Sequence, residues 1–399
     1  MSPSSAKELL IMNSPKLRFK NFNDEWISKK LGDICNIVMG QSPNSENYNN
    51  GHNGIPLIQG NADILDRKTN PQNFTIQITK TCNIGDILMS VRAPVGNVAI
   101  SYHYACIGRG ICSISTKLSQ KYVYQFLISY EKNWRKISQG STFQSINSKD
   151  ICNIIINLPS IEEQTKIANF LSLIDRKIEL QEKLVENLKL YKKGLLQKVF
   201  SNNHGWKSAK LGDLGNTYTG LSGKSKEDFK NGNSKFITYM NVFSNCISNN
   251  QQLENISINS NETQNKVKYG DIFFTTSSET PKEVGMSSVW LFNDDNIYLN
   301  SFCFGFRLNN ITNFNIKFLA YLLRSYLIRK KIIFLAQGST RYNISKNELM
   351  NLEILYPNIE EQTKIANLFS NLDKKIDFET NRLTKLKEYK KGLLQQIFI

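Results

Sequence analysis

Two short polar loops contain the residue types that form hydrogen bonds with nucleic acids. They read QGSTFQ at residues 139–144 and QGSTRY at residues 337–342, so four residues are shared and two differ. Gln and Arg side chains bind a base edge through two hydrogen bonds, whereas Ser and Thr hydroxyls contact the phosphate backbone. A turn that only ends a helix is the other interpretation of this motif. The DNA contacts predicted from these loops are Gln139, Ser141, Thr142, Phe143, Gln144, Gln337, Ser339, Thr340, Arg341 and Tyr342.

Three other segments carry side chains of the same kind. They are the loop after Gly40, the Gly- and Ser-rich stretch GLSGKSK at residues 220–226, and the SVRAPVG segment with its counterpart before Gly285. Backbone N–H groups in Gly-rich turns form concavities that bind phosphate. Arg109 and Arg307 fit surface salt bridges as well as they fit DNA. The candidates from the three segments are Gln41, Ser42, Tyr48, Arg92, Ser222, Lys224, Lys226, Ser278 and Lys282.

The sequence contains no complete catalytic or metal-binding motif. GLSGKS lacks the first glycine of a phosphate-binding P-loop, because Tyr218 occupies that position. Residues 70–72 do not match the NPP-aromatic tetrapeptide of amino-methyltransferases, and residues 388–390 have only the second half of a nuclease motif. Three histidines and seven cysteines without a C-x-x-C pair give no metal-ligand spacing. We therefore predict no catalytic and no metal-ligating residue.

The 399-residue chain is strongly basic, with 50 Lys and Arg against 34 Asp and Glu and a formal net charge of +16. Such a field attracts polyanions such as nucleic acids. Only 11 of the 50 basic residues are Arg, so a coding bias toward Lys is a second explanation of the charge. The cysteine pattern and the lack of an apolar run of about 18 residues predict a cytoplasmic protein with reduced thiols.

A long internal repeat organises the rest of the chain. Residues 161–200 and 359–398 are identical at 23 of 40 positions, at a constant offset of 198 (359 − 161). A repeat of this period indicates a duplicated architecture. Apolar residues recur at intervals of three and four in both copies, interrupted only at Gln181 and Glu379. This pattern predicts two long helices with an apolar seam.

Both predicted helices begin with the same signals. Ser160 and Asn358 occupy the N-cap positions after a proline, and Glu163 and Glu361 follow three residues later. This spacing predicts a capping box in each copy.

The segments before the two helices repeat the same order of elements. KLGDI and KLGDL lie at an offset of 180, Gly-Asp-Ile at 185, and QGST at 198. Short β-branched runs predict a mixed or mostly antiparallel sheet, followed by a helix over residues 122–137 and a strand over residues 151–158. Because the frames match while the loops differ, we predict one task performed on two different targets.

The chain resembles the specificity subunits of type I restriction–modification systems over nearly its whole length. The resemblance rests on the duplicated helix opening P-x-I-E-E-Q-x-K-I-A, on GQSP with Tyr48 and GIPLIQG in the first half, and on TGLSGKSKEDF and KFITYMNVF in the second. It implies an α+β fold in which two mixed α/β target-recognition domains are joined by two long antiparallel coiled-coil helices with a pseudo-two-fold internal repeat. The implied division is a tail at 1–16, domains at 17–158 and 201–356, and spacer helices at 159–200 and 357–399.

The resemblance also implies a function. Each domain would recognise one half of a bipartite, asymmetric site in double-stranded DNA, and the helices would set the length of the spacer between the halves. The chain would be non-catalytic and bind no cofactor. Two modification subunits would bind S-adenosylmethionine, and up to two restriction subunits would use ATP and Mg²⁺. We expect the modification subunits to dock on the outer faces of the helices and on the constant domain edges. Apolar helix positions outside the seam, such as Leu180, Leu190 and Phe378, are candidates for this contact; packing on the recognition domains is the other interpretation.

Two other functions stay open at this point. One is a stand-alone DNA methyltransferase or nuclease, against which the missing motifs argue. The other is a coiled-coil scaffold whose charge reflects coding bias only.

Two predictions follow from the implied layout of the site. Insertion of one helical turn after Ile174 is predicted to lengthen the spacer, and replacement of residues 220–229 is predicted to alter one half-site only.

Overall fold

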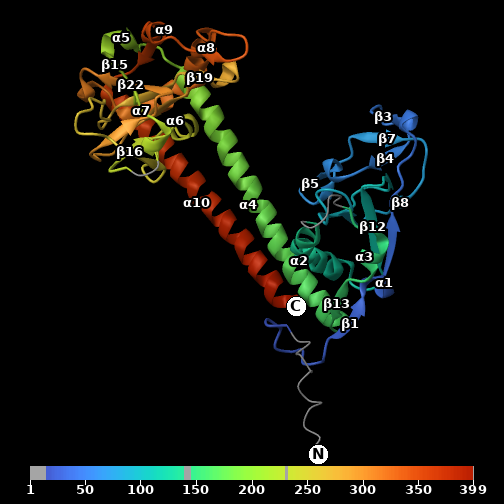
Figure 1. Cartoon of the computed structure of the whole chain (residues 1–399). Coiled ribbons are helices and arrows are strands. Elements are labelled where there is room, and N and C mark those ends of the chain that lie inside the picture. Colours follow the sequence, from blue (N-terminus) through green and yellow to red (C-terminus); the bar gives the residue numbers. More distant parts are fainter. Residues whose placement is uncertain (1–14, 139–144, 230–231, 399) are drawn as a thin grey trace, which may run out of the picture. The chain divides into compact units, whose positions relative to one another are not determined.

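The computed structural model describes residues 15–138, 145–229 and 232–398, and the chain divides into two compact units (Figure 1). Unit 1 comprises residues up to 182 together with those from 381, and unit 2 comprises residues 183–380. Each unit contains one predicted recognition domain and one segment of each long helix. The boundaries expected at residues 17, 159, 201 and 357 follow the linear chain, whereas the compact units cut through both helices.

Unit 1 contains many short strands and three helices of its own among the described residues. Its strands are β1 (Ile27–Lys30), β2 (Cys35–Met39), β3 (Tyr48–Asn49), β4 (Ile55–Ile58), β5 (Ile64–Leu65), β6 (Lys68–Thr69), β7 (Asn73–Thr75), β8 (Thr81–Cys82), β9 (Ile87–Ser90), β10 (Val98–Ile100), β11 (Ala105–Ile107), β12 (Ile111–Thr116) and β13 (Ile155–Leu158). Its helices are α1 (Leu31–Ile34), α2 (Gln120–Ser138) and α3 (Ser148–Cys152), with 3₁₀ turns η1 (Ser45–Asn47) and η2 (Asn61–Asp63).

The strands of unit 1 form two larger sheets and one pair. The sheet orders are β2-β12-β9-β10-β6-β5, β3-β7-β4-β11-β8 and β1-β13. Most neighbours are antiparallel, while β10 pairs with β6 and β11 with β4 in parallel. The predicted mixed, mostly antiparallel sheet is therefore confirmed.

The core of unit 1 packs the six-stranded sheet against α2 and the long helices. Strand β9 is buried at every residue, as expected for a central strand covered on both faces. Leu127 of α2 and Leu171 join it, and Leu393 and Ile397 from the last turns of the chain are only 6 % and 3 % exposed. The first half of the sequence thus needs the last residues to complete its core.

Unit 2 repeats this order with different lengths. Its strands are β14 (Lys207–Lys210), β15 (Gly215–Thr219), β16 (Ser234–Ile237), β17 (Leu253–Ile256), β18 (Ile272–Thr275), β19 (Ser277–Ser278), β20 (Ser287–Val289), β21 (Ile297–Leu299), β22 (Cys303–Leu308), β23 (Tyr342–Asn343) and β24 (Glu353–Tyr356). Its helices are α5 (Leu211–Leu214), α6 (Tyr239–Ser244), α7 (Ile316–Leu323), α8 (Tyr326–Phe334) and α9 (Lys346–Met350), with 3₁₀ turns η3 (Lys226–Phe229), η4 (Pro281–Glu283) and η5 (Ile311–Asn313). The sheet orders are β15-β22-β18-β20, β17-β16-β21, β14-β24 and β19-β23.

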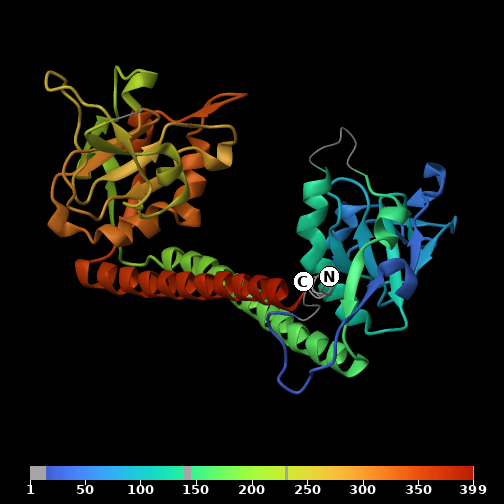
Figure 2. The same ribbon diagram turned by 60° about the horizontal axis from the view of Figure 1, so that its bottom comes forward.

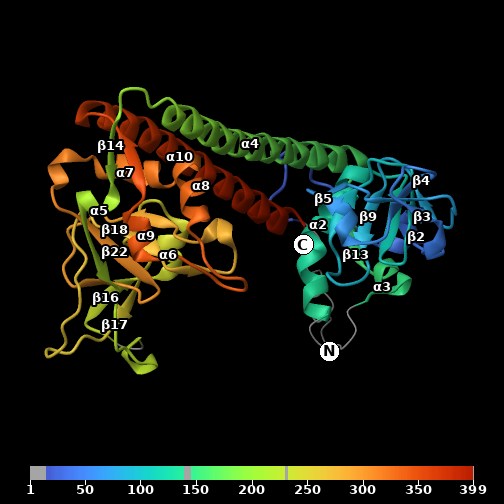
Figure 3. The same ribbon diagram turned by 90° about the horizontal axis from the view of Figure 1, so that it is seen from above.

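The central helix of unit 2 is broken where that of unit 1 is continuous. Helix α2 runs for 19 residues, but the corresponding stretch of unit 2 divides at Arg324 and Ser325 into α7 and α8. Helix α7 reads IKFLAYLL and is buried on nearly all sides, next to the sheet and the start of the second long helix (Figure 3).

The two long helices are α4 (Ile161–Ser201) and α10 (Ile359–Ile397), each uninterrupted (Figure 2). Both predicted helices are therefore confirmed. Their N-caps are as expected, because the Glu163 N–H donates to Ser160 Oγ (3.3 Å) and the Glu361 N–H donates to Asn358 Oδ1 (2.9 Å). The reciprocal half of the capping box was predicted wrongly. The Glu163 carboxylate accepts two hydrogen bonds from Arg18 instead, at 2.9 and 2.8 Å.

Equivalent ion pairs join the helix segments within each unit. In unit 1, Lys390 of α10 pairs with Asp175 of α4, and in unit 2, Lys192 of α4 pairs with Asp373 of α10. Each residue of one pair has its counterpart in the other pair at an offset of 198. In unit 2, Phe200 also stacks on Phe369. Within each unit, the two helix segments therefore run antiparallel along the predicted seam.

Two further expectations were tested by the fold. The helix over residues 122–137 is confirmed by α2. The strand expected over residues 151–158 begins only at Ile155, because Ile151 belongs to α3, which Asn147 caps. Among the described residues, no helix is long and apolar enough to cross a membrane.

Candidate nucleic-acid interface

In unit 1, the loop after β2 lies against the loop between β11 and β12. The Arg109 N–H donates a hydrogen bond to Ser42 Oγ at 3.2 Å. Gly40 permits this approach, because a Cβ there would lie 2.3 Å from the Gly108 carbonyl oxygen. The side chains of Gln41 and Arg109 are both exposed. Gln41, a predicted DNA contact, thus lies on a loop next to that of Arg109, for which the sequence left DNA contact and surface salt bridge open.

The loop between β9 and β10 continues this edge. The Val91 N–H donates to the Gly110 carbonyl (2.9 Å), and the Ile146 N–H donates to the Val91 carbonyl (3.0 Å). Arg92 forms a β-bridge with Ser145. Its side chain is exposed and forms no ion pair with any residue that the structure describes. We call the edge formed by residues 40–42, 91–92, 109–110 and 145–146 contact edge 1.

Contact edge 1 ends at the first polar loop predicted from the sequence. Ser145, the first described residue after that loop in the sequence, forms the bridge to Arg92. The loop residues Gln139, Ser141, Thr142, Phe143 and Gln144 lie outside the described residues.

Tyr48 lies in the five-stranded sheet and supports the loop before it. It is half-buried in β3, and its hydroxyl donates to the Pro43 carbonyl at 3.0 Å. This contact holds the backbone that presents Gln41 and Ser42.

In unit 2, strands β19 and β23 bring two predicted segments side by side. Ser277 pairs with Asn343, and Ser278 pairs with Tyr342. Ser278 is buried, and its hydroxyl donates to Glu283 at 3.3 Å. Lys282, in the turn that follows, is exposed. The side chain of Ser278 therefore shapes this turn, while Lys282 reaches solvent.

The loop of residues 337–342 is closed by its own backbone. Gln337 and Asn343 exchange two hydrogen bonds, at 2.9 and 2.8 Å, and Gly338 has a φ of +122° with its Cβ position 2.2 Å from the Arg341 carbonyl oxygen. The Gln337 amide donates to both carboxylate oxygens of Glu348 (3.1 and 3.2 Å). The exposed residues at the tip are Ser339, Thr340 and Arg341, with Tyr342 half-buried beside them.

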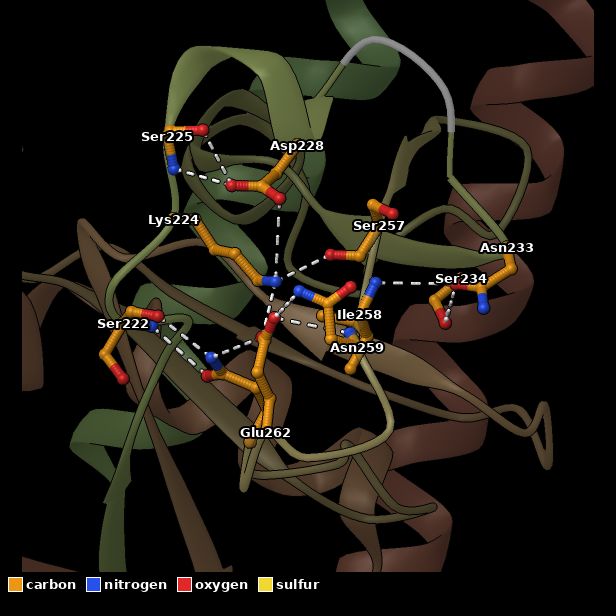
Figure 4. Close-up of polar contacts among 11 residues, drawn as sticks. Ser222, Lys224, Ser225, Asp228, Asn233, Ser234, Ser257, Ile258, Asn259 and Glu262 are labelled. Carbon is orange, nitrogen blue, oxygen red and sulfur yellow. Dashed lines mark hydrogen bonds and ion pairs between the residues drawn. The ribbon is translucent and has the colours of Figure 1, made fainter.

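Lys224 has an internal role in the structure (Figure 4). Its ammonium donates to the Ser257 carbonyl (2.7 Å), pairs with Glu262, and lies 4.0 Å from Asp228. The side chain is only 4 % exposed. Its hydrogen bond lowers the pKa of Glu262. The geometry thus directs this cation to the protein, where it ties residues 222–229 to residues 257–262.

Ser222 and Lys226 flank Lys224 and are exposed. The Ser222 backbone exchanges two hydrogen bonds with the Gln264 amide, at 3.2 and 2.8 Å. The Lys226 side chain forms no ion pair with any described residue. In this segment, Lys226 is the cation that faces solvent.

The backbone of unit 2 joins these segments as in unit 1. The Leu221 N–H donates to Leu299 O (2.7 Å), the Thr276 N–H donates to Phe302 O (3.0 Å), and the Ile344 N–H donates to Thr276 O (3.0 Å). We call the edge formed by residues 220–222, 276–282, 300–303 and 337–344 contact edge 2.

The two contact edges use equivalent backbone pairings. The bridge of Arg92 with Ser145 corresponds to the pairing of Ser277 with Asn343, at the offsets of 185 and 198 found in the sequence. The hydrogen bond from Ile146 to Val91 likewise corresponds to that from Ile344 to Thr276. The frames are therefore the same, while the side chains on them differ.

Two exposed apolar residues that the sequence did not single out lie in contact edge 2 or beside it. Phe302 is 56 % exposed and occupies the place of Gly110 in contact edge 1. Met240 of α6 is 59 % exposed, and the neighbouring Tyr239 donates its hydroxyl to the Ser277 carbonyl (2.8 Å). One sequence feature could have indicated Phe302, because it is an aromatic residue in a polar turn directly before a buried strand.

Arg307 forms a salt bridge, one of the two roles that the sequence left open for it, and it is not part of contact edge 2. It donates two hydrogen bonds of 2.7 Å to the buried Asp271 carboxylate, which also accepts from Tyr218 (2.6 Å). The hydrogen bond to Asp271 raises the pKa of Arg307. Among the described residues, no group of three His, Cys, Asp or Glu side chains is arranged to hold a metal ion.

Two equivalent edges on a duplicated α+β frame define a protein with two related candidate contact sites. The model of the type I restriction modification DNA specificity domain matches the chain twice, over residues 23–190 and 203–388. The chain therefore belongs to the family of type I restriction–modification specificity subunits. This membership confirms the expected fold class and confirms that the chain is a recognition subunit rather than an enzyme.

Individual relatives agree with this assignment. The chain is 36 % identical over 178 residues to the putative MjaX specificity subunit of Methanocaldococcus jannaschii, a match that spans 43 % of this chain and 42 % of that protein. It is 25 % identical to the MjaIX specificity subunit of the same organism over 94 % of this chain and 92 % of that protein. The crystal structure of an S subunit from M. genitalium has the same fold, with a TM-score of 0.59, 18 % identity, and coverage of 97 % and 99 %.

Proposed function

We propose that this chain recognises a bipartite, asymmetric site in double-stranded DNA, with one half-site for each contact edge. The observation that carries the proposal is the pair of equivalent edges. They share backbone pairings, yet edge 1 presents Gln41, Arg92 and Arg109 where edge 2 presents Lys282, Arg341 and Phe302. Different donors on the same frame suit different base sequences.

The exposed cations support DNA as the ligand. Arg92, Arg109, Lys226 and Arg341 are exposed on or beside the edges, and none forms an ion pair with a described residue. Guanidinium groups suit guanine edges and phosphates, whereas ammonium groups act on phosphate as point charges. We keep Gln139, Ser141, Thr142, Phe143 and Gln144 in the proposed site of edge 1, because Ser145 adjoins Arg92.

We further propose that two modification subunits dock on the long helices. Leu180 and Phe378 are equivalent and are 52 % and 61 % exposed, and Tyr191 and Tyr389 are equivalent and 61 % and 57 % exposed. Each unit thus carries one residue of each pair, as two copies of one partner require. Leu190 is 58 % exposed, but its counterpart at the offset of 198 is Glu388. Leu190 can therefore offer an apolar contact to only one of the two modification subunits.

The catalytic cofactors belong to the partners in this proposal. S-adenosylmethionine would be held by the modification subunits, and ATP with Mg²⁺ by up to two restriction subunits. We assign the functional boundaries as 17–158 and 201–356 for the recognition domains, with spacer helices 159–200 and 357–399. All seven cysteines are free thiols, which suits the cytoplasm.

The test is to express the chain with its modification partner and to map methylated bases across the host genome. Two short specified sequences separated by a fixed number of unspecified bases are expected. Methylation without a shared sequence would refute the proposal. Incorporation of labelled methyl groups by the purified chain alone would show instead that it carries its own catalytic centre.

The independence of the two edges is tested by exchanging one segment. Residues 220–229 are replaced by those of a relative, together with residues 257–262, because Lys224 joins the two segments. One half-site is expected to change and the other to stay. A change in both half-sites would show that the edges do not act separately.

A further inference from the structure

The side chain of Arg329, on helix α8 of unit 2, binds the backbone of the loop that begins in contact edge 2 at residues 276–282. The Arg329 guanidinium of α8 donates to the carbonyl oxygens of Gly285 (2.7 Å), Val284 (2.7 Å) and Lys282 (2.9 Å). A single planar donor group thus fixes three backbone carbonyls within residues 282–285. The ion pairs of this unit among the described residues do not include it, so its partners are carbonyls rather than a carboxylate.

The equivalent position in unit 1 holds the corresponding loop with the opposite charge. Glu131 of α2 lies 198 residues before Arg329, and its carboxylate accepts the Val98 N–H (3.1 Å) and two hydrogen bonds from Arg67 (2.6 and 3.1 Å). Arg67 in turn donates to the Val98 carbonyl (3.1 Å). Glu131 and Arg67 therefore bind both backbone groups of the residue at which the Arg92 loop ends.

A second contact between helix and loop is also equivalent in the two units. Gly96 has a φ of +85°, and a Cβ there would lie 2.4 Å from the Trp134 ring. Gly285 has a φ of +61°, and a Cβ there would lie 2.9 Å from Ile332. Trp134 and Ile332 are themselves 198 residues apart. In both units, the helix thus packs directly on a left-handed glycine of the loop.

We propose that Glu131 and Arg329 are positioning residues for specificity, each of which sets the shape of the loop that serves one half-site. Each acts from the helix behind its loop and touches no base. The charge at this one helix position differs because the two loops present different backbone groups, an N–H in unit 1 and carbonyls in unit 2. This inference rests on the proposed bipartite recognition.

Arg329 keeps its charge in this setting. Burial and, to a smaller extent, the nearby Arg324 together lower the pKa of its guanidinium to about 10. At neutral pH the group is still protonated, so all three carbonyl contacts persist. Lysine at this position would keep the charge but lack the planar array of donors.

The experiment uses the full chain assembled with its modification subunits and duplexes that carry the mapped site. Binding is measured for the intact site and for duplexes with either half-site scrambled, which gives a discrimination ratio for each half. Arg329→Lys is expected to lower the ratio for the unit 2 half-site about tenfold, the equivalent of one lost charged hydrogen bond, and to leave the other ratio unchanged. Glu131→Gln is expected to do the reverse.

Matched controls keep the result interpretable. Lys330→Ala removes an exposed charge next to Arg329 and is expected to leave both ratios as they are. Hydrogen exchange is expected to speed up at residues 282–286 in Arg329→Lys and around residue 98 in Glu131→Gln. Unchanged ratios in both variants, or equal losses at both half-sites, would overturn the inference. A wild-type complex that discriminates neither half-site would refute the proposed function instead.

Discussion

Lys224 was predicted from the sequence as a DNA contact, but its side chain binds Ser257 and Glu262 of the protein. Lys224→Met is expected to lower the free energy of unfolding by about 1–3 kcal/mol, because it removes the charged hydrogen bond to the Ser257 carbonyl from a nearly buried side chain. Urea denaturation followed by Trp fluorescence measures the change. Lys226→Met, which removes an exposed charge two residues away, is expected to change stability by less than about 0.5 kcal/mol. Equal effects would contradict the internal role of Lys224.

The same pair has a pH signature. Because Lys224 lowers the pKa of Glu262 in the folded chain, the interaction stabilises the fold above the ordinary glutamate pKa of about 4.3 and is lost as the pH falls through the lowered value. The stability difference between the wild type and Lys224→Met is therefore expected to shrink on acidification from pH 6 to pH 3. A difference that stays constant over this range would show that Glu262 is not the partner that matters.

The exposed cations are expected to act on DNA affinity rather than on stability. Arg92→Ala and Lys226→Ala should each reduce the slope of log affinity against log salt by about 0.9, the value for one phosphate contact. Binding titrations of the assembled complex between 50 and 200 mM salt measure this slope. Lys224→Met serves as the control, since its buried ammonium is expected to leave the slope unchanged.

The sequence predicted the loops of the contact edges but not the contacts made by each side chain. Arg92 and Arg341 are exposed as their loop chemistry suggested, whereas Lys224 is bound to Glu262 in a segment that no local pattern links to it. Phe302 was missed because one exposed aromatic residue has no periodic signature. Contacts between distant segments depend on the fold, and a motif specifies only the residue types that are available.

Among the elements, the long helices offer the most direct control of spacer length. Matched insertions of seven residues after Glu182 in α4 and after Thr380 in α10 fall at the boundary of the two units and keep the face that each helix presents. About 10 Å of added helix should lengthen the spacer by roughly 3 base pairs while both half-sites persist. Methylation mapping measures the outcome.

An insertion in α4 alone is the control for this experiment. It shifts one helix against the other, so the pairs Asp175–Lys390 and Lys192–Asp373 cannot both form. Loss of specific methylation is expected from it. The insertion after Ile174 that the sequence suggested falls inside unit 1 instead, where it would shift Leu171 and Ile174 against Leu393 and Leu394 of the same core. An unchanged spacer in the matched variant would show that the helices do not set the distance.

The helices also show which boundaries can be predicted from sequence patterns and which cannot. The limits of α4 and α10 follow from capping residues and apolar spacing, which act locally. The break between α7 and α8 does not, because there Arg324 donates to the carbonyls of Ser287, Val242, Phe243 and Asn245, which lie in other elements. Tertiary contacts of this kind override helix propensity and leave no periodic trace.

At the scale of the whole molecule, the repeated apolar positions predict the composition of the assembly. Leu180→Glu and Phe378→Glu are each expected to leave a complex with one modification subunit, and the double variant a chain with none, because a buried carboxylate at the contact is costly. Mass measurement of the purified complexes gives the count. Lys177→Glu on the same helix is a stricter control, because it introduces the same carboxylate and changes the net charge by two units instead of one. Loss of a subunit there would point to electrostatics instead.

Unit 1 is built from two separate parts of the sequence, residues up to 182 and those from 381, and this affects the order in which the units fold during synthesis. Domains usually fold as they emerge, the first one first. Here Leu393, Leu394 and Ile397 belong to the core built by residues of the first half, whereas unit 2 is complete at residue 380. The half that is translated first is therefore finished last. Until residues 381–397 have been synthesised, the apolar face that they cover is expected to stay open to chaperones. A chain shortened before Leu393 is expected to form unit 2 while unit 1 lacks part of its core.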